Sequence, residues 1–448
     1  MIYPQHIFKA NDIRGLLHEV TPEIAEAVGK RLVEKNQAKI IVVGRDMRKT
    51  SPELAEAIIR GAKSAGATVR DIGMVTTSLF NFAVSSDPSV DAGLMVTASH
   101  NPAEWNGIKM AWSNGLPIPG KEMLTWLQEE SSPFRGQEGV RENVNSIHEY
   151  LAHVLKKSGL AKEKISGAKL VVDFGNGMGA LTIRPFLQGL GVSVVELFSE
   201  PDASFPNHEA NPTKHETLVT LQKRVVEEKA DFGVALDGDA DRIAFVDNEG
   251  IPLPGDLTLA LLAESSLQKK KGKIIGAPNQ GRAVREAVAA AGGTYIDVPI
   301  GRAFLIKAIN DEQATLGGEV SGHFMFEEMG NLESVDFALA QILGLWKESG
   351  KTFADLVRPL RRFYSSGEVN IEVADKEAIL AYLEKTFGAQ ATSVSRLDGV
   401  RAEFGSSWWF IVRPSNTEPL LRITVEAESE ALMKEKRDEI VEAAKSVK

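Results

Sequence analysis

Short apolar runs that end at glycine or at a polar turn recur along the chain. Three of them begin with a lysine and lie at residues 39–44, 169–175 and 273–278. Short β-branched runs that are stopped by turn residues indicate buried strands. Each run is followed by a helical pattern that closes at a glycine, and the three helices are expected at about 51–65, 180–190 and 283–291.

Two further strands follow in each of these segments. The second strands are expected at 68–72, 193–198 and 294–298, and the third strands at 92–96, 232–236 and 314–316. Strands that alternate with helices at this spacing indicate parallel α/β units with right-handed crossovers. The pattern therefore predicts an α/β fold with three repeated α/β domains, which we expect to hold mixed sheets.

The last part of the chain breaks this pattern. Strands are expected at 368–373, 408–412 and 421–425, and helices at 375–386 and 428–447. This order indicates a smaller C-terminal α+β domain with antiparallel strands. We therefore expect four domains, at residues 1–148, 149–250, 251–365 and 366–448.

Composition narrows the range of functions. The chain has 448 residues, no cysteine and a formal net charge of −10. The lack of cysteine excludes a disulfide frame, a thiol nucleophile and cysteine-ligated zinc. The negative charge excludes a general basic surface for nucleic acid, but it leaves open a local cationic pocket for a small anion.

The apolar stretches give no sign of a membrane protein. The longest, 257–263 and 337–346, are too short to span a bilayer, and the N-terminus has no apolar run typical of a signal peptide. We therefore expect a soluble, cytoplasmic protein that binds a small molecule rather than a nucleic acid or a membrane. No obligate protein partner is evident, and we expect a monomer or a dimer.

Polar clusters follow the third strand of each repeat. They are Thr-Ala-Ser-His-Asn-Pro at 97–102, Asp-Gly-Asp-Ala-Asp-Arg at 237–242 and Gly-Glu-Val-Ser-Gly-His at 318–323. In parallel sheets, ligands bind beyond the carboxyl ends of the strands. Because equivalent loops of a repeat carry such different residues, each loop is expected to have its own role.

Three carboxylates stand close together in the second loop. Asp237, Asp239 and Asp241 alternate with small residues, and they repel one another unless a cation lies among them. Oxygen ligands at this density suit Mg²⁺. A calcium-binding EF-hand does not fit, because Arg242 stands at its sixth position and Asn248 at its twelfth. A solvated acidic turn remains the alternative.

The first loop and the C-terminal domain hold further polar candidates. Ser99 beside His100 suggests a nucleophile, although a turn rich in such residues is often only a cap. Arg413 offers a planar fork for phosphate oxygens, and the residues after Pro414 add donors. These donors are Ser415, Asn416 and Thr417. A strand-to-turn transition with a surface arginine explains the same segment equally well.

Cations near the N-terminus are ambiguous by themselves. Lys9 and Arg14 flank a turn before Gly15, and Lys109 follows the first polar loop. They could hold an anion or lie on the surface. The segment 175–180 fits a dinucleotide fingerprint, but a lone match of this kind is weak, because a tight turn explains the glycines.

Four motifs in combination are far more specific than any one of them. With Arg-Pro-Ser-Asn-Thr-Glu-Pro at 413–419, the three polar loops make this chain resemble the α-D-phosphohexomutase superfamily. The resemblance covers essentially the whole chain and is strongest to the bacterial phosphomannomutase/phosphoglucomutases. It implies four domains arranged around a central cleft.

The resemblance also implies a role for each loop. Ser99 would be phosphorylated and would donate and accept the phosphoryl group, with Mg²⁺ held between it and the three aspartates. Glu319 and Ser321 would contact sugar hydroxyls. Arg242, Lys9, Arg413, Ser415, Asn416 and Thr417 would contact the substrate or its phosphate. His100 would orient the serine loop, and the general base would be one of His323, Lys109 and Arg14.

These roles imply the reaction of a mutase. Phosphorylated Ser99 would give its phosphoryl group to a hexose 1-phosphate, which would form a 1,6-bisphosphate. This intermediate would turn over in the cleft and return its 1-phosphoryl group to Ser99, releasing the hexose 6-phosphate. Glucose 1,6-bisphosphate, or the corresponding hexose 1,6-bisphosphate, is therefore expected as an activator.

The sugar is less clear than the chemistry. Val320, between Glu319 and Ser321, favours mannose and glucose phosphates over glucosamine phosphate, which stays as the alternative. Asn11, Asn279 and Arg302 depart from the motifs of dual-specificity members, and Arg302 is the best candidate for a substituted substrate contact. A non-catalytic sugar-phosphate binding protein, a Mg²⁺ phosphatase and a nicotinamide enzyme are the alternatives from other functional classes.

Overall fold

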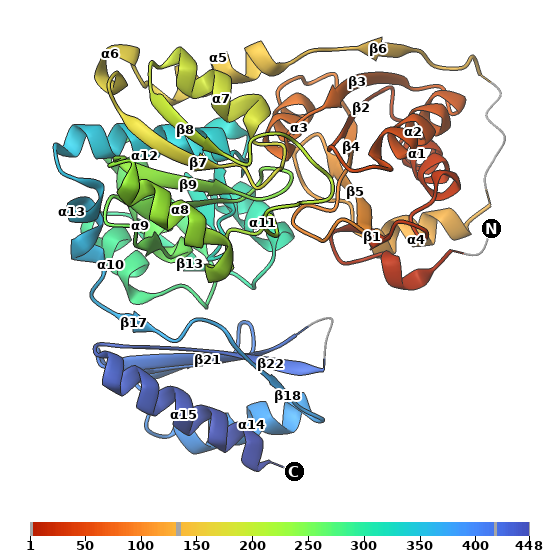
Figure 1. The fold of residues 1–448 in the computed structure, drawn as a ribbon. Helices are drawn as coiled ribbons and strands as arrows, with labels where there is room; N and C mark the ends of the chain where they lie inside the picture. Colours follow the sequence, from red (N-terminus) through yellow and green to blue (C-terminus); the bar gives the residue numbers. More distant parts are fainter. Residues whose placement is uncertain (1–2, 131–135, 416–418, 448) are drawn as a thin grey trace.

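The computed structural model describes residues 3–130, 136–415 and 419–447 (Figure 1). Within these residues the strands form four separate sheets. Three sheets belong to the repeated units, and the fourth lies in the C-terminal part, which is drawn in blue in Figure 1. The predicted fold class, three α/β units with mixed sheets and a smaller α+β domain, is confirmed.

The first sheet has the strand order β1-β5-β4-β2-β3-β6. Its strands are β1 Asp12–Leu16, β2 Ile40–Arg45, β3 Thr68–Met74, β4 Ala92–Val96, β5 Trp105–Trp112 and β6 Arg141–Asn143. Its helices are α1 Pro22–Asn36, α2 Ser51–Ser64, α3 Thr77–Ser85 and α4 Gly120–Gln128, and a short 3-10 helix, Gln5–Ile7, precedes β1. Since β5 returns antiparallel to β4 and then pairs with β1, it places the N-terminal strand beside the first polar loop.

The second sheet has the order β11-β10-β9-β7-β8. Its strands are β7 Lys169–Asp173, β8 Ser193–Leu197, β9 Phe232–Leu236, β10 Ile243–Asp247 and β11 Pro252–Leu253. Its helices are α5 Ile147–Ser158, α6 Lys162–Ile165, α7 Ala180–Gly189 and α8 His215–Glu227. β9 runs parallel to β7 and turns through the aspartate loop into the antiparallel strand β10.

The third sheet repeats this plan in the order β13-β12-β14-β15-β16. Its strands are β12 Lys273–Gly276, β13 Thr294–Asp297, β14 Leu316–Gly318, β15 Phe324–Phe326 and β16 Leu332–Glu333. Its helices are α9 Gly255–Lys269, α10 Arg282–Ala290, α11 Arg302–Glu312, α12 Val335–Ser349 and α13 Phe353–Val357, with 3-10 turns at Glu327–Met329 and Arg358–Leu360.

One strand of this repeat differs from the prediction. The third strand was expected at 314–316, but β14 covers Leu316–Gly318. Gly317 and Gly318 are weak strand formers, so the sequence pattern underestimates them. The neighbours explain their presence, because a Cβ at Gly317 would lie 2.5 Å from a methyl carbon of Ile309.

The fourth sheet is antiparallel, as predicted. Its order is β17-β22-β21-β20-β19, and β18 also pairs with β22. Its strands are β17 Tyr364–Ser365, β18 Val369–Glu372, β19 Ser393–Ser395, β20 Val400–Phe404, β21 Trp408–Pro414 and β22 Leu420–Ala427. Helices α14 Lys376–Gly388 and α15 Glu430–Ser446 pack on one side of it (Figure 1).

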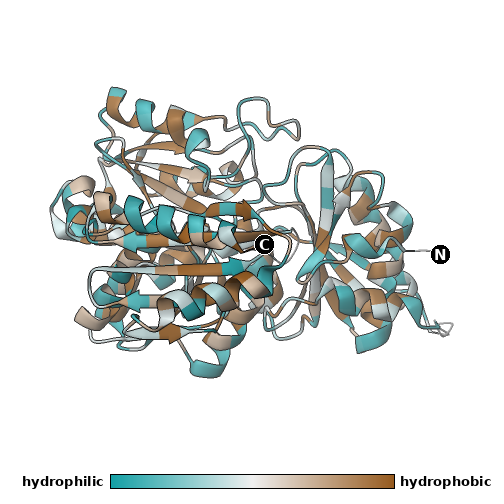
Figure 2. Cartoon of the chain, turned by 90° about the horizontal axis from the view of Figure 1, so that it is seen from below, coloured by the Kyte–Doolittle hydropathy of each residue, from teal (hydrophilic) through white to brown (hydrophobic). Residues whose placement is uncertain are grey.

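The apolar core shows how these units are joined. One cluster of buried side chains runs through all three repeats and includes Val42, Phe174, Phe232 and Phe337. The C-terminal domain has a cluster of its own, around Phe410 and Ile423. In Figure 2 the strands are mostly brown and lie between helices with teal outer faces. The three repeats therefore form one packed body, onto which the fourth domain docks.

The sequence also led us to expect no membrane-spanning helix, three domain boundaries and a central cleft. Among the described residues, no helix has both the length and the apolar character needed to cross a bilayer. The predicted boundaries near residues 148, 250 and 365, and the central cleft, stay predictions.

Candidate active site

The first polar loop leaves β4 and places Ser99 in a disfavoured conformation. Ser99 is buried and has a φ of 52°, in the left-handed region that non-glycine residues rarely occupy. Its N–H donates to Thr97 Oγ1 at 2.9 Å. Its hydroxyl donates to Asp237 Oδ2 at 2.8 Å and lies 3.2 Å from His100 Nδ1. The loop thus aims the serine at the aspartate loop of the second unit.

The three aspartates of the second loop form one buried cluster. Carboxylate oxygens of Asp237, Asp239 and Asp241 all lie within 4.8 Å of one another. Burial and the two neighbouring carboxylates raise the pKa of Asp237 well above its usual value. Oδ1 of Asp239 is buried and has no hydrogen-bond partner within the described residues. Close oxygen ligands with an unpartnered atom fit a hard divalent cation such as Mg²⁺.

Lys109 neutralises part of this cluster. It lies on β5, and its Nζ is 2.7 Å from Asp239 Oδ2 and 2.5 Å from Asp241 Oδ2. Burial alone would lower the pKa of Lys109, but the two carboxylates outweigh burial and raise it. For Asp241, burial would raise the pKa, but Lys109 and His323 hold it well below its usual value. Lys109 is therefore a cation at neutral pH.

Arg14 approaches the serine loop from β1. Its Nη1 donates to Asn101 Oδ1 at 2.9 Å, and its Nη2 pairs with Asp12 Oδ2 at 2.6 Å. The antiparallel register of β1 with β5 places Asp12 opposite Lys109, so both cations lie at the same edge of the sheet. Lys9 lies in the preceding turn, where its N–H donates to Asp12 O. Within the described residues, no ion pair holds the Lys9 ammonium.

Two histidines face this cluster in different charge states. Burial and the Arg242 and Arg14 cations lower the pKa of His100 to about 2, so its ring is neutral. For His323, burial lowers the pKa, but the Asp241 and Glu319 carboxylates raise it to about 9. Its Nε2 lies 3.1 Å from Asp241 Oδ1, so the ring carries a proton at neutral pH.

The third loop meets the second across a domain boundary. Ile243 N–H donates to Gly322 O at 3.1 Å. Glu319 Oε2 lies 2.8 Å from His323 Nδ1 and accepts a hydrogen bond from Ser321 Oγ at 3.2 Å. Arg242 Nε lies 3.2 Å from His323 Nε2 and 3.9 Å from Asp237 Oδ2. The predicted residues of loops two and three are thus in direct contact.

Arg302 stands at the start of α11 and is held by a buried carboxylate. Its Nε pairs with Glu333 Oε1, and its Nη2 lies 2.8 Å from Glu333 Oε2. Asn81 of α3 donates to the same Oε2 at 3.2 Å. Burial lowers the pKa of Arg302, but Glu333, Asp241 and Glu319 raise it overall. Arg302 therefore lies near the site, with its guanidinium fixed in place.

The fourth loop is described only in part. Asn416 and Thr417 lie outside the described residues. Ser415 is buried, and Lys376 donates to its carbonyl at 2.7 Å. Arg413, at the end of β21, pairs with Glu368 of its own domain at 3.1 Å. Over the described ranges, no hydrogen bond or ion pair joins Arg413 to the other three loops.

Comparison with known proteins agrees with this arrangement. Phosphoglucomutase/phosphomannomutase α/β/α domains I, II and III match residues 5–130, 148–250 and 254–363, and the C-terminal domain of the same family matches 368–443. A relative from Xanthomonas campestris, named phosphohexose mutases, is 35% identical over 437 residues, which cover 96% of this chain and 97% of that protein. The chain belongs to the phosphoglucomutase/phosphomannomutase family. It is therefore a mutase, an enzyme of the isomerase class.

Other members of the family give two further comparisons. A crystal structure of a phosphoglucomutase/phosphomannomutase family protein from Burkholderia thailandensis is similar with a TM-score of 0.89 and 28% identity, covering 99% of this chain and 98% of that chain. A relative from Methanopyrus kandleri, named probable phosphoglucosamine mutase, is 33% identical over 441 residues, or 97% of each chain. Overall identity therefore does not separate the sugars.

Sequence reasoning missed several residues that support the mutase site. Thr77, at the start of α3, donates its hydroxyl to Asp239 Oδ2 at 2.7 Å. Arg48 and Asp46 lie under the serine loop, after the end of β2. The rule that placed the other loops, polar residues after a parallel strand, also applies to the segment 44–48 and would have found these two.

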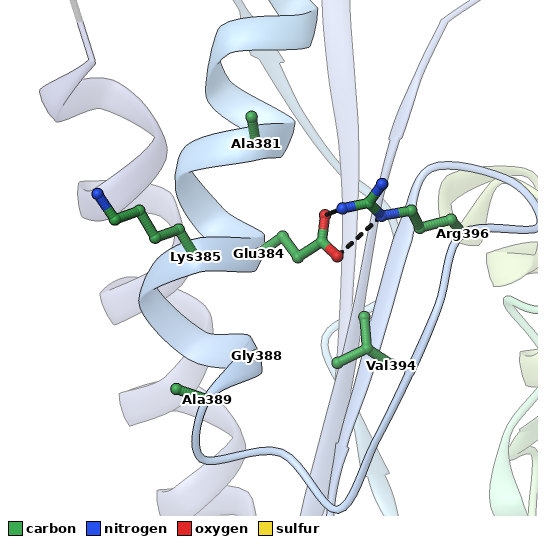
Figure 3. A pocket seen from close by; sticks show the side chains of 7 residues that line it. All are labelled: Ala381, Glu384, Lys385, Gly388, Ala389, Val394 and Arg396. Atoms are coloured by element: carbon green, nitrogen blue, oxygen red, sulfur yellow. Dashed lines mark hydrogen bonds and ion pairs between the residues drawn. The ribbon is translucent and has the colours of Figure 1, made fainter.

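A hollow on the surface of this mutase lies elsewhere. Figure 3 shows the residues that line it, between α14 and β19 of the C-terminal domain. Its volume is about 400 Å³. Glu384 and Arg396 form an ion pair across it, at 2.6 Å. None of the four polar loops lines this hollow, so we give it no part in the reaction.

Proposed function

We propose that this mutase interconverts hexose 1-phosphates and hexose 6-phosphates, of mannose or glucose, through a phosphorylated Ser99 and a 1,6-bisphosphate. The observation that carries the proposal is the buried contact between Ser99 Oγ and Asp237 Oδ2, at 2.8 Å. A serine hydroxyl held in a rare backbone conformation against three acidic groups has no evident structural use. It suits a residue that carries a phosphoryl group beside a metal ion.

Phosphoryl transfer needs alignment and charge neutralisation more than covalent chemistry. Mg²⁺ would be held by the phosphate on Ser99 and by three carboxylates, those of Asp237, Asp239 and Asp241. When bound, it would neutralise part of the charge on the transferred group. Arg14 is held beside the serine loop by hydrogen bonds to Asp12 and Asn101. It would bind oxygens of the phosphoryl group.

Proton transfer requires a group that can change its charge. In the first transfer the attacking sugar hydroxyl loses a proton and the leaving oxygen of Ser99 takes one up, and in the second transfer the hydroxyl of Ser99 loses that proton again. Their raised pKa values keep Lys109 and Arg14 cationic, so these two would stabilise charge. His323 is the remaining candidate, because its imidazole contacts both the aspartate loop and Glu319. The Asp241 carboxylate keeps this ring protonated, and a divalent cation held by the aspartates would offset that carboxylate, so the ring could then lose and regain a proton.

Sugar recognition would involve the third unit. Glu319 and Ser321 are proposed to bind sugar hydroxyls, and Arg302 is proposed to bind the sugar or its phosphate. Val320 between them is 38% exposed and free to face a ligand. Asn11 and Asn279, which depart from the motifs of the family, are proposed to affect the choice of sugar. Lys9, Arg242 and the fourth loop, Arg413 to Thr417, would bind the phosphate.

The test is ³¹P NMR of the enzyme with an equal mixture of glucose, mannose and glucosamine 1-phosphates, Mg²⁺ and a trace of glucose 1,6-bisphosphate. We expect 6-phosphate signals for mannose and glucose before glucosamine. A faster glucosamine signal would favour the alternative, a phosphoglucosamine mutase. Isomerisation that continues in Ser99→Ala would contradict the phosphoserine route, and release of free phosphate instead would indicate a phosphatase.

A further inference from the structure

Arg48 is buried beneath the serine loop. Its side chain has no exposed surface, and it reaches four backbone carbonyls of one short segment. Nη2 donates to Ser99 O at 2.9 Å and to Asn101 O at 2.5 Å. Nη1 donates to Pro102 O at 2.7 Å and to Trp105 O at 2.9 Å. One planar guanidinium therefore donates hydrogen bonds to four carbonyls of the loop from Ser99 to Trp105.

Other groups hold this guanidinium in place. Asp46 Oδ2 lies 3.2 Å from Arg48 Nε, and Asp46 Oδ1 accepts from Arg48 N–H at 2.9 Å and from Ser51 Oγ at 2.5 Å. The ring of Phe205, from the second unit, lies 5.2 Å from the guanidinium carbon. Arg48 is thus fixed from its own domain by a carboxylate and covered from the neighbouring domain by an aromatic ring.

The loop that Arg48 binds contains Ser99, the residue with the strained backbone. Ser99, with a φ of 52°, keeps this conformation only if its surroundings determine it. Thr97 holds its N–H and Arg48 holds its carbonyl. Asn101, whose carbonyl also binds Arg48, accepts a hydrogen bond from Arg14 through its side chain. One buried arginine therefore fixes both the serine and the loop that holds Arg14.

We propose that Arg48 is a positioning residue, which holds Ser99 Oγ at the distance and angle that phosphoryl transfer requires. The inference rests on the proposed function. In the transfer, the bond between phosphorus and Ser99 Oγ breaks as a bond forms between phosphorus and the sugar oxygen. The sugar hydroxyl gives its proton to a base of the enzyme, and the leaving Ser99 Oγ takes up a proton to become a hydroxyl. A displacement of about 1 Å in such a reaction costs on the order of 100-fold in rate.

The test is the variant Arg48→Lys. A lysine keeps the charge opposite Asp46, but its compact ammonium cannot bond four carbonyls at once. Because Arg48 touches no substrate, we expect kcat to fall about 100-fold while KM stays within about threefold. A purely structural role would not separate kcat from KM in this way.

Arg31→Lys is the matched control. Arg31 is also a buried arginine of the first unit, and it donates to the carbonyls of Glu129 and Glu130, away from the serine loop. We expect this control to lose stability while keeping kcat within about twofold of the parent. Thermal unfolding of both variants shows whether the two losses of stability are comparable.

Each outcome has a distinct meaning. If the parent enzyme does not isomerise sugar phosphates, the proposed function fails. If the parent is active and Arg48→Lys keeps its kcat, or both lysine variants lose kcat equally, the role of Arg48 is refuted. If Arg48→Lys does not fold, the variant Phe205→Leu is tested instead, because the ring of Phe205 covers the guanidinium of Arg48. We expect the kcat of Phe205→Leu to fall about tenfold at constant KM. An unchanged kcat overturns the inference.

Discussion

Replacing Gly238 by alanine tests how closely the metal loop and the serine loop must approach. Gly238 lies between Asp237 and Asp239, and its backbone packs against the carbonyl of Ser99. A Cβ at this position would lie 2.4 Å from Ser99 O, which is a backbone atom that cannot rotate away. Normal contact between a carbon and an oxygen is about 3.4 Å, so the two loops would have to separate by about 1 Å.

The size of the effect follows from this displacement. A shift of about 1 Å between reacting groups costs on the order of 100-fold in rate, which is about 2.7 kcal/mol of activation free energy. Overpacking of this kind costs about 1–3 kcal/mol in stability. We therefore expect Gly238→Ala to fold with a lower Tm and with kcat reduced about 100-fold.

The assay compares this variant with Gly189→Ala. Gly189 lies in the last turn of α7, and no atom lies within 4 Å of a Cβ built there. The control should keep both kcat and Tm, because alanine fits the space and favours the helix. Steady-state isomerisation is followed by ³¹P NMR, and thermal unfolding by circular dichroism. If Gly238→Ala retains kcat within about threefold, the close approach of the two loops does not limit the reaction.

Three more changes give defined outcomes. Ser99→Ala should lower the rate of isomerisation by more than about a thousandfold, while the exposed control Ser89→Ala leaves the rate unchanged. Equal rates in the two variants would exclude Ser99 from the mechanism. Lys109→Met removes the cation that Asp239 and Asp241 share, so in EDTA the free energy of unfolding in urea should fall by about 3–5 kcal/mol. Mg²⁺ should stabilise this variant more than the parent, and the same Mg²⁺ effect on both would contradict this reasoning. Asp336 is buried, and burial raises its pKa to about 6. The folded state therefore holds the proton of Asp336 more tightly than the unfolded state does. This contribution to stability, about 3 kcal/mol, is lost as the pH rises from about 4 to 6. In Asp336→Asn the free energy of unfolding in urea should fall less over that pH range, whereas the exposed control Asp355→Asn should behave like the parent. If Asp336→Asn shows the same pH dependence as the parent, the carboxyl of Asp336 is ionised in the folded parent.

The repeated architecture could be read from local patterns. The strand expected at 232–236 is β9, Phe232–Leu236, and the helix expected at 51–65 is α2, Ser51–Ser64. Apolar runs and the residues that stop them act over a few positions, so the sequence shows them directly. The pattern failed at β14, because two glycines there are selected by the neighbouring side chains rather than by strand propensity.

The acidic loop was also visible in the sequence. Its three aspartates lie within five residues, and their mutual repulsion makes a cation an expected partner whatever surrounds them. The identities of the four polar loops, and the family that they indicate, likewise depend only on residue order. Nothing in the sequence showed that Ser99 would adopt a left-handed backbone conformation or that Arg302 would be tied to Glu333.

Contacts between distant residues were decided by the tertiary structure alone. Ser99 meets Asp237 across 138 positions, and Lys109 meets Asp239 across 130. Arg48 binds carbonyls about 50 positions away. Charge states follow the same rule, because burial and neighbouring carboxylates set the pKa values of His100 and His323 in opposite directions. The sequence by itself determined which chemical groups are present and which loops carry them. Only the packing of the domains, which removes water and brings charges together, determined how those groups act on one another.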